Sequence, residues 1–163
     1  MGMNDQITIK LKKINTIKIG IIDENGKDTG EYLEFNLNDT DLLLKYQEAI
    51  EQLKANKNAL KMSFALINKK QDHSGKNLLS SQLEEKLKAF NTFMEKEMAA
   101  YDMFLGKDGC KKILNGKKPY YEMFTDIDEM IQPILPMIKK GWDDLENRLI
   151  NKYVNVEENN VLK

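Results

Sequence analysis

One short stretch of the chain, GKDGCKKILNGKKP from Gly106 to Pro119, combines the glycines and lysines that bind phosphate in many proteins. A Walker A loop has the pattern G-x-x-x-x-G-K, then Ser or Thr, and follows a strand. Here Gly109 and Gly116 are too far apart, and Lys118 stands where the hydroxyl residue should be. The pattern therefore favours a joint between helices, in which Gly106 and Gly116 end the preceding helical turns.

The lysines of this stretch, with Tyr120 and Tyr121 beside them, are also residue types that bind single-stranded nucleic acid. Acidic residues follow directly, at Glu122, Asp126, Asp128 and Glu129. The whole chain has 25 Lys+Arg and 26 Asp+Glu, whereas nucleic-acid-binding domains usually carry a basic excess. A solvated lysine face is therefore favoured, and nucleic acid is not an expected partner.

Side chains that could catalyse a reaction or bind a metal are few. His73 is the only histidine and Cys110 the only cysteine, which excludes an internal disulfide and a structural zinc site of Cys and His ligands. Neither residue has a partner in a nucleophile motif. The acidic groups around Asp126 and Asp143 lack the spacing of a calcium-binding loop. We therefore expect no catalytic residue, no metal, no cofactor and no enzymatic activity.

The length and composition predict one folded domain. The 163 residues are 41% hydrophobic and 31% charged, which suits a single domain over residues 1–153. The N-terminal residues MGMNDQITIK lack the apolar centre of a signal peptide, and no apolar run approaches the ~20 residues of a membrane span. We therefore expect an intracellular protein that does not enter a membrane.

Residues 7–37 carry the two-residue alternation of β-strands. The segments ITIKLK, TIKIGII and YLEFNL each alternate apolar and polar residues. Thr16–Ile22 and Glu31–Leu37 are predicted to pair as an antiparallel hairpin, with turn conformations at Asn25-Gly26 and Thr29-Gly30. The ITIKLK segment is a candidate third strand. A hairpin alone is barely stable, so its apolar face requires a helix over it.

The period then changes to that of α-helices. The predicted segments are a helix over 39–67, a loop over 68–77 and a second helix over 81–105. Asn38 or Asp39 is expected to cap the first helix. Ser81 and Glu84 have the spacing of a capping box at the start of the second, which has the strongest amphipathic pattern of the chain.

The C-terminal half continues with a joint over 106–118, a kinked helix or helix pair over 119–153, and a frayed tail over 154–163. Asp108 is expected to cap a short helical turn in the joint. Pro119 fits the first position of the next helix, and Pro133 and Pro136 predict a kink or junction near Gln132. The fold class is therefore α+β and mostly helical: an N-terminal antiparallel β-hairpin of two or three strands packed on about four α-helices.

Methionines are concentrated in the later helices. Six of the 9 methionines lie at or after Met94. Methionine fills irregular gaps in a core, which is the favoured role for most of these residues, but it also forms adaptable binding surfaces. The predicted lining of a groove for a partner's helix consists of four residues that flank the joint: Met103, Phe104, Met123 and Phe124.

Two short motifs accompany this order of segments. In the first, a strand ends in F-x-x-x-D and leads directly into a helix with an R/K-Y/F-x-x-A pattern. The residues that fit it are Phe35, Asp39, Lys45, Tyr46 and Ala49. In the second, a phenylalanine-rich helix ends in F-G-x-G-x-x-K-K-I-F-G-G-K. The residues that align loosely with it are Phe104, Gly106, Gly109, Lys111 or Lys112, Ile113, Gly116 and Lys117.

This combination resembles a family of small proteins encoded in the tail gene region of phages and prophages of Gram-positive (Firmicute) bacteria, which are similar to tail assembly chaperones. The resemblance implies a non-enzymatic factor in the host cell cytoplasm. Such a factor binds the tape-measure protein, helps to recruit tail-tube subunits and forms a homo-oligomer. The alternatives are a structural tail or head–tail accessory protein, a small phage protein that binds and inhibits a host defence protein, and a nucleic-acid-binding accessory protein that uses Lys107–Lys118.

Overall fold

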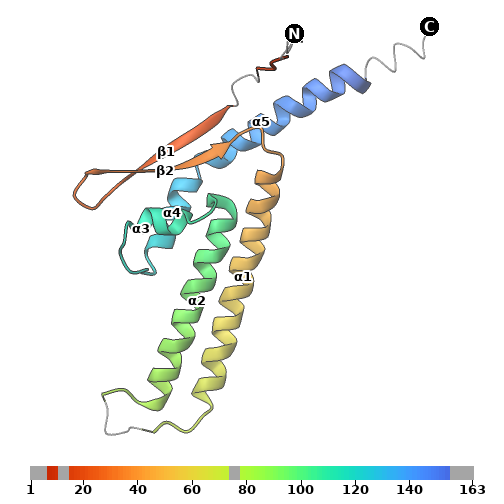
Figure 1. The fold of residues 1–163 in the computed structure, drawn as a ribbon. Coiled ribbons are helices and arrows are strands. Elements are labelled where there is room, and N and C mark those ends of the chain that lie inside the picture. Colours follow the sequence, from red (N-terminus) through yellow and green to blue (C-terminus); the bar gives the residue numbers. More distant parts are fainter. Residues whose placement is uncertain (1–6, 11–14, 74–77, 155–163) are drawn as a thin grey trace, which may run out of the picture.

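The computed structural model describes residues 7–10, 15–73 and 78–154. They form a mostly helical α+β fold, as predicted, with a β-hairpin next to one end of a pair of long helices (Figure 1). The strands are β1 (Thr16–Ile22) and β2 (Asp28–Asn36). The helices are α1 (Asp41–Asn68), α2 (Ser81–Leu105), α3 (Gly109–Leu114), α4 (Met123–Ile131) and α5 (Ile134–Leu149), and a π-helical segment (Ile150–Val154) continues α5.

The hairpin is antiparallel, and its register places Ile17 opposite Phe35. Gly26 lies in the connection with a φ angle of 76°, which confirms the predicted turn at Asn25-Gly26. The predicted turn at Thr29-Gly30 is wrong, because both residues belong to β2; Gly30 has a φ angle of 78° where the strand pairing is irregular. Phe35 is buried, and its ring lies 5.2 Å from the ring of Phe104 on α2. The hairpin is therefore held by the helices that cover its apolar face, as its small size requires.

Two predicted terminal segments lie wholly or partly outside the described residues. The prediction of a third strand is wrong for the part of that segment that the structure describes. Ile7–Lys10 form no strand, and the side chains of Ile7 and Ile9 are exposed. Residues 11–14 of that segment are not described. An alternating pattern does not make a strand without a neighbour with which to pair its backbone. Of the predicted tail over 154–163, only Val154 is described, at the end of the π-helical segment.

The helices α1 and α2 run antiparallel and lie side by side over most of their length (Figure 1). The bounds of α2 are the predicted ones, whereas α1 begins at Asp41 and ends at Asn68. Asp39 acts at the start of α1, as expected: its carboxylate accepts a hydrogen bond from the N–H of Asp41 at 2.9 Å.

The cap of α2 lies one residue before the predicted one. Ser80 has an extended backbone, and its hydroxyl accepts a hydrogen bond from the N–H of Leu83 at 3.2 Å. Ser81 is already helical, and its hydroxyl accepts a hydrogen bond from the N–H of His73 at 2.8 Å. The sequence could not distinguish two adjacent serines, because a capping residue needs a non-helical backbone that the entering loop determines.

The joint after α2 contains a short helix, as predicted, but Asp108 does not cap it. Asp108 has a left-handed φ of 58°, and its side chain makes no capping hydrogen bond. The carboxylate of Asp102, on α2, instead accepts a hydrogen bond from the N–H of Cys110 at 2.8 Å. A Cβ at Gly109 would lie 2.5 Å from the Cβ of Leu105, so a glycine is needed where α3 packs on the end of α2.

The predictions made from the prolines were confirmed only in part. The prediction that Pro119 starts a helix is wrong, since α4 begins at Met123. The fixed φ of proline suits an extended chain as well as a first helical turn, so the residue type alone did not decide between them. The predicted junction is confirmed, because Gln132 and Pro133 separate α4 from α5. Pro136 lies in the first turn of α5, where the helix requires no N–H.

The core lies between the hairpin and the helices. It is formed by the hairpin, the adjoining parts of α1 and α2, the short helices α3 and α4, and the start of α5. Its largest fully buried side chains are Leu33, Phe35, Glu97, Cys110, Met123, Ile127 and Ile138. Trp142, Leu149 and Tyr153, further along the chain, are exposed. The second half of α5 extends beyond the core, as its blue end shows in Figure 1. No described element covers its apolar stripe there.

Candidate partner-binding groove

Three of the four side chains predicted to line a groove are in the core. Phe104, Met123 and Phe124 have exposed fractions of 4%, 1% and 4%. The ring of Phe104 lies 5.2 Å from the rings of Phe35 and Tyr46, and the ring of Phe124 stacks on that of Tyr101 at 5.1 Å. Met103 is exposed because it points about 100° away from Phe104 around the helix. The predicted groove is therefore not formed at the surface.

Cys110 is fully buried. Its thiol lies 3.6 Å from the carbonyl oxygen of Met98, to which it donates a weak hydrogen bond. Burial raises the pKa of the Cys110 thiol, and the carboxylate of Asp102 raises it further. The thiol therefore stays protonated at neutral pH, whereas a nucleophilic cysteine requires a thiolate.

The lysines of the joint lie at the surface, as predicted for a solvated face. Lys117 forms an ion pair with Glu24 in the turn of the hairpin. Lys111 lies 3.9 Å from the carboxylate of Asp108. The chain's own acidic residues thus neutralise part of the charge that a phosphate ligand would need.

The other candidate chemical groups are dispersed. His73 is exposed in the connection between α1 and α2. Within residues 7–10, 15–73 and 78–154, no group of three or more His, Cys, Asp or Glu is placed to hold a metal ion. None of the helices described there has the length and apolar character needed to cross a membrane.

An apolar groove of about 440 Å³ lies along α1 and α2, beside the connection between α3 and α4. We call it the aromatic groove; its apolar lining consists of Leu60, Phe64, Phe90, Phe93 and Tyr121. Leu60 and Phe64 are four residues apart on α1, and Phe90 and Phe93 are three apart on α2. Each pair therefore projects from one face of its helix. Tyr121 contributes from the connection that precedes α4.

The aromatic groove exists because the later helices are too short to cover the α1–α2 pair. Helix α2 has 25 residues, whereas α4 has 9. At 1.5 Å per residue these lengths are about 38 Å and about 14 Å. The apolar stripes of α1 and α2 continue beyond the edge of α4, where Leu60, Phe64 and Phe90 are only partly buried and Phe93 is buried.

The aromatic rings of the groove support one another. The centre of the Phe90 ring lies 5.8 Å from that of Phe93 and 6.2 Å from that of Tyr121. Tyr121 in turn lies 6.3 Å from the buried ring of Phe124. Since these contacts hold the rings before any partner binds, little side-chain entropy is lost on binding.

Lysines border the aromatic groove. Lys57 and Lys61 belong to its lining, and the ammonium group of Lys86 lies 6.0 Å from the centre of the Phe64 ring. Among the described residues, none of these three lysines has an ion-pair partner. The surface combines an apolar floor with a positive rim. It suits an amphipathic helix that carries acidic residues beside its apolar stripe.

A carboxyl group is buried one turn after Phe93 on α2. Glu97 is 2% exposed, and Asn56 of α1 is buried with it. The Oε1 atom of Glu97 and the Nδ2 atom of Asn56 have no hydrogen-bond partner in the structure. Burial raises the pKa of the Glu97 carboxyl, while Asn56 and Lys57 act in the opposite direction. Glu97 is not part of the groove lining, so it affects the stability of the α1–α2 pair and not a ligand there.

A hydrogen bond joins α2 to α4 next to this carboxyl group. The hydroxyl of Tyr101 donates to Oδ1 of Asp128 at 2.7 Å. Burial raises the pKa of Tyr101, and the Asp128 carboxylate raises it further, so the phenol remains a donor at neutral pH. The bond helps to hold α4 against α2.

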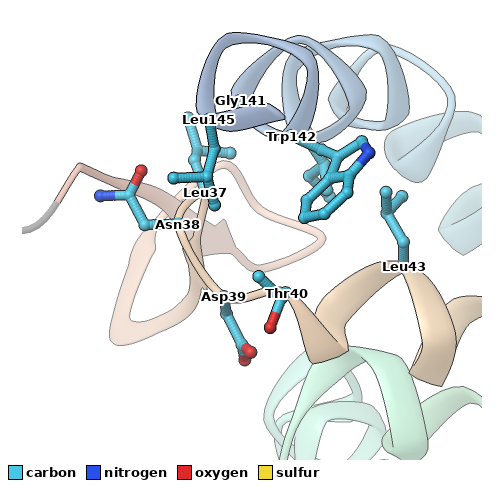
Figure 2. Close-up of a pocket in the computed structure, with 9 residues that line it drawn as sticks. Leu37, Asn38, Asp39, Thr40, Leu43, Gly141, Trp142 and Leu145 are labelled. Atoms are coloured by element: carbon cyan, nitrogen blue, oxygen red, sulfur yellow. The ribbon is translucent and has the colours of Figure 1, made fainter. Parts of the chain in front are cut away.

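A second hollow lies where α5 crosses the turn between β2 and α1 (Figure 2). Its volume is about 10 Å³, room for one water molecule at most. Figure 2 shows Trp142 of α5 beside Leu43 of α1, with Leu37 and Leu145 nearby. The hollow is a packing contact that attaches α5 to the fold, and it is too small for a ligand.

The sequence predicted the two long helices and the amphipathic pattern of the second, but it did not predict this groove. The groove could have been located by comparing the lengths of the two long helices with the lengths of the segments that follow them. Two stripes continue over helices of 28 and 25 residues, and the segments left to cover them are shorter. Which part stays uncovered depends on where α4 docks.

Comparisons with protein-family models, curated proteins and solved structures found no significant match. The evidence for a function is therefore the surface of the molecule itself, together with the resemblance described above.

Proposed function

We propose that this chain is a phage tail assembly chaperone, a non-enzymatic protein that covers apolar helical stretches of the tape-measure protein with its aromatic groove. The observation that carries the proposal is the aromatic groove itself, with its volume of about 440 Å³ on the outside of the α1–α2 pair. The resemblance supplies the role, the host cell cytoplasm as its location and the tail-tube subunits as further partners.

The geometry of the groove fits the side of a helix. Two helices form its long walls, so a third helix can insert apolar side chains spaced three, four and seven residues apart. Each such side chain, when fully buried, gains about 1.5–3 kcal/mol. Three anchors therefore gain roughly 5–9 kcal/mol before the cost of association is subtracted. The net affinity is modest, as release during tail assembly requires.

The test is co-expression with the tape-measure protein of the same phage or prophage. The wild-type chain is expected to keep the tape-measure protein soluble and to co-purify with it. A tape-measure protein that remains insoluble beside the wild-type chain, and does not co-purify, overturns the proposal.

A matched pair of variants locates the binding surface. The F64S/Y121S variant alters the groove, whereas M62S/Y120S replaces a large apolar residue of α1 and a tyrosine at exposed positions outside its lining. We expect F64S/Y121S to lose the tape-measure protein and M62S/Y120S to keep it, with equal helical content by circular dichroism. Equal binding by both variants shows that another surface is used.

A further inference from the structure

The part of α1 that lines the aromatic groove is basic. Over residues 52–71 the sequence contains five lysines and no aspartate or glutamate. Lys57 and Lys61 are four residues apart, so both project from the side of α1 that faces the groove. Lys86 of α2 adds a third ammonium group, 6.0 Å from the centre of the Phe64 ring. We call these three residues the lysine rim.

The acids closest to the lysine rim along α2 are paired with other lysines. Glu84 and Glu85 precede Lys86 directly in the sequence. The carboxylate of Glu84 lies 3.0 Å from the ammonium group of Lys88, and that of Glu85 lies 3.2 Å from the ammonium group of Lys70. These two acids are therefore already engaged away from the rim.

Two further acids lie near the groove. Glu97 is 2% exposed and is not part of the lining, although its buried carboxyl interacts electrostatically with Lys57. Glu122 is exposed and follows Tyr121 in the connection before α4. Both acids are in the described part of the chain, and neither forms an ion pair with the lysine rim. The rim therefore presents its positive charge to whatever occupies the groove.

The apolar floor of the groove can select little by itself. Leu83 and Leu87 are 43% and 45% exposed, and they continue the stripe of Phe90 along α2 at intervals of four and three residues. Such a surface gains free energy from any apolar helix face of suitable length, because the hydrophobic effect is non-directional. Like charges that meet across an interface are unfavourable, so discrimination between occupants must come from the rim.

We propose that Lys57, Lys61 and Lys86 are the specificity-determining residues of the aromatic groove. They select helices whose apolar stripe is flanked by aspartate and glutamate, and they reject helices whose stripe is flanked by lysine and arginine. The inference rests on the proposed function for the identity of the client. Within a long client, the apolar stretches with acidic flanks are the ones that this chain covers.

Synthetic helical peptides test the selection with this chain alone. Three peptides carry the same leucine stripe and differ only in its flanks, which are glutamate, glutamine or lysine. Fluorescence anisotropy of the labelled peptides should show that the glutamate peptide binds roughly three- to thirtyfold more tightly than the glutamine peptide, and that the lysine peptide binds most weakly. At about 1 M salt the difference should shrink, because exposed charges are then screened.

Charge reversal assigns the preference to the lysine rim. The K57E/K61E variant should reverse the order of the three peptides. The K139E/K140E variant changes the net charge by the same amount at exposed positions of α5 outside the groove lining, so it should keep the wild-type order. Circular dichroism checks that both variants are folded.

Equal binding of the three peptides by wild type overturns the selection, and so does an unchanged order in K57E/K61E. Peptides that do not bind at all, as when a second copy of the chain fills the groove, overturn it as well. The proposed function fails separately. A tape-measure protein that stays insoluble in co-expression refutes the chaperone role even where the peptide order holds, whereas co-purification together with equal peptide binding refutes only the selection.

Discussion

The α-carbon of Gly141 on α5 lies so close to Leu37 that a Cβ at this position would be 2.8 Å from the Leu37 carbonyl oxygen. A real Cβ essentially never approaches an oxygen so closely. The glycine thus allows α5 to cross the turn between β2 and α1 in direct contact.

Replacing Gly141 by alanine should lower the free energy of unfolding by about 1–3 kcal/mol, because the backbone of Leu37 cannot yield like a flexible side chain. In a helix free of this contact, the same change would stabilise by up to about 1 kcal/mol. Urea unfolding, followed by the fluorescence of the adjacent Trp142, measures the difference. K140A, at an exposed neighbouring position, is the control. An equal or greater stability of G141A would show that α5 is not held at this contact.

The buried Glu97 makes stability depend on pH in a defined direction. Burial raises its pKa in the folded state, so the folded protein holds the proton more tightly than the unfolded chain does. Stability contributed by this group is therefore present at low pH and is lost as pH rises through the folded pKa. E97Q removes the charge and should be more stable than wild type near neutral pH, by about 1–2 kcal/mol.

The advantage of E97Q should disappear below the ordinary pKa of glutamate, about 4.3, where both states of the wild type are protonated. Urea unfolding of wild type and E97Q over a series of pH values gives the comparison. E95Q, at an exposed position on the same helix, should show no such pH-dependent gain. A difference between E97Q and wild type that does not vary with pH would contradict the assigned burial effect.

Loss of the Tyr101 hydroxyl should cost about 1 kcal/mol of stability, the net value of one hydrogen bond. The cost stays small because Asp128 is exposed and water can replace the donor. Thermal and urea unfolding of Y101F measure it, with Y120F, at an exposed tyrosine, as the reference. A Y101F protein as stable as Y120F would mean that the bond between α2 and α4 contributes nothing.

The thiol of Cys110 should react slowly while the protein is folded. It is 0% exposed, so a reagent cannot reach it. Its pKa is raised by burial and by Asp102, so the thiol is not ionised to the reactive thiolate. With a disulfide reagent at mildly alkaline pH, we expect a rate at least about 100-fold below that of the urea-unfolded chain, since reaction requires opening of the fold. Similar rates in the two states would refute the burial of α3 against α2.

Two adjacent residues distinguish core from surface at the end of α2. F104D places an unpaired charge beside Phe35 and should cost more than about 4 kcal/mol, enough to unfold a domain of this size. M103D, at an exposed position, should leave the fold intact. Circular dichroism and gel filtration separate the outcomes. Comparable folding of the two variants would restore Phe104 as a surface residue.

Much of the fold could be predicted because its signals are local. The alternation in TIKIGII and YLEFNL, Asn25-Gly26 and the prolines near Gln132 each act over a few residues, and the hairpin, its turn and the junction between α4 and α5 were predicted from them. The errors arose where one residue type serves two conformations. Pro119 suits an extended chain as well as a helix, and Ser80 and Ser81 both suit a cap.

The candidate site could not be predicted in the same way. Phe104 and Phe64 both lie on apolar stripes of long helices, yet one is buried against the hairpin and the other borders an open groove. Their local sequence does not distinguish them. The difference is made by the hairpin and the start of α1, whose Phe35 and Tyr46 rings contact Phe104, whereas Phe64 lies near the other end of α1.

By itself the sequence determined where helices and strands form, because backbone conformation and the period of apolar residues depend on near neighbours along the chain. Only the tertiary structure decided which apolar residues remain at the surface. Exposure depends on whether a distant segment reaches a side chain, and that is set by helix lengths and docking angles. Helix α4 has 9 residues and is too short to cover α2, which has 25, so the aromatic groove stays open, and Leu149 and Tyr153 stay exposed near the end of the described chain.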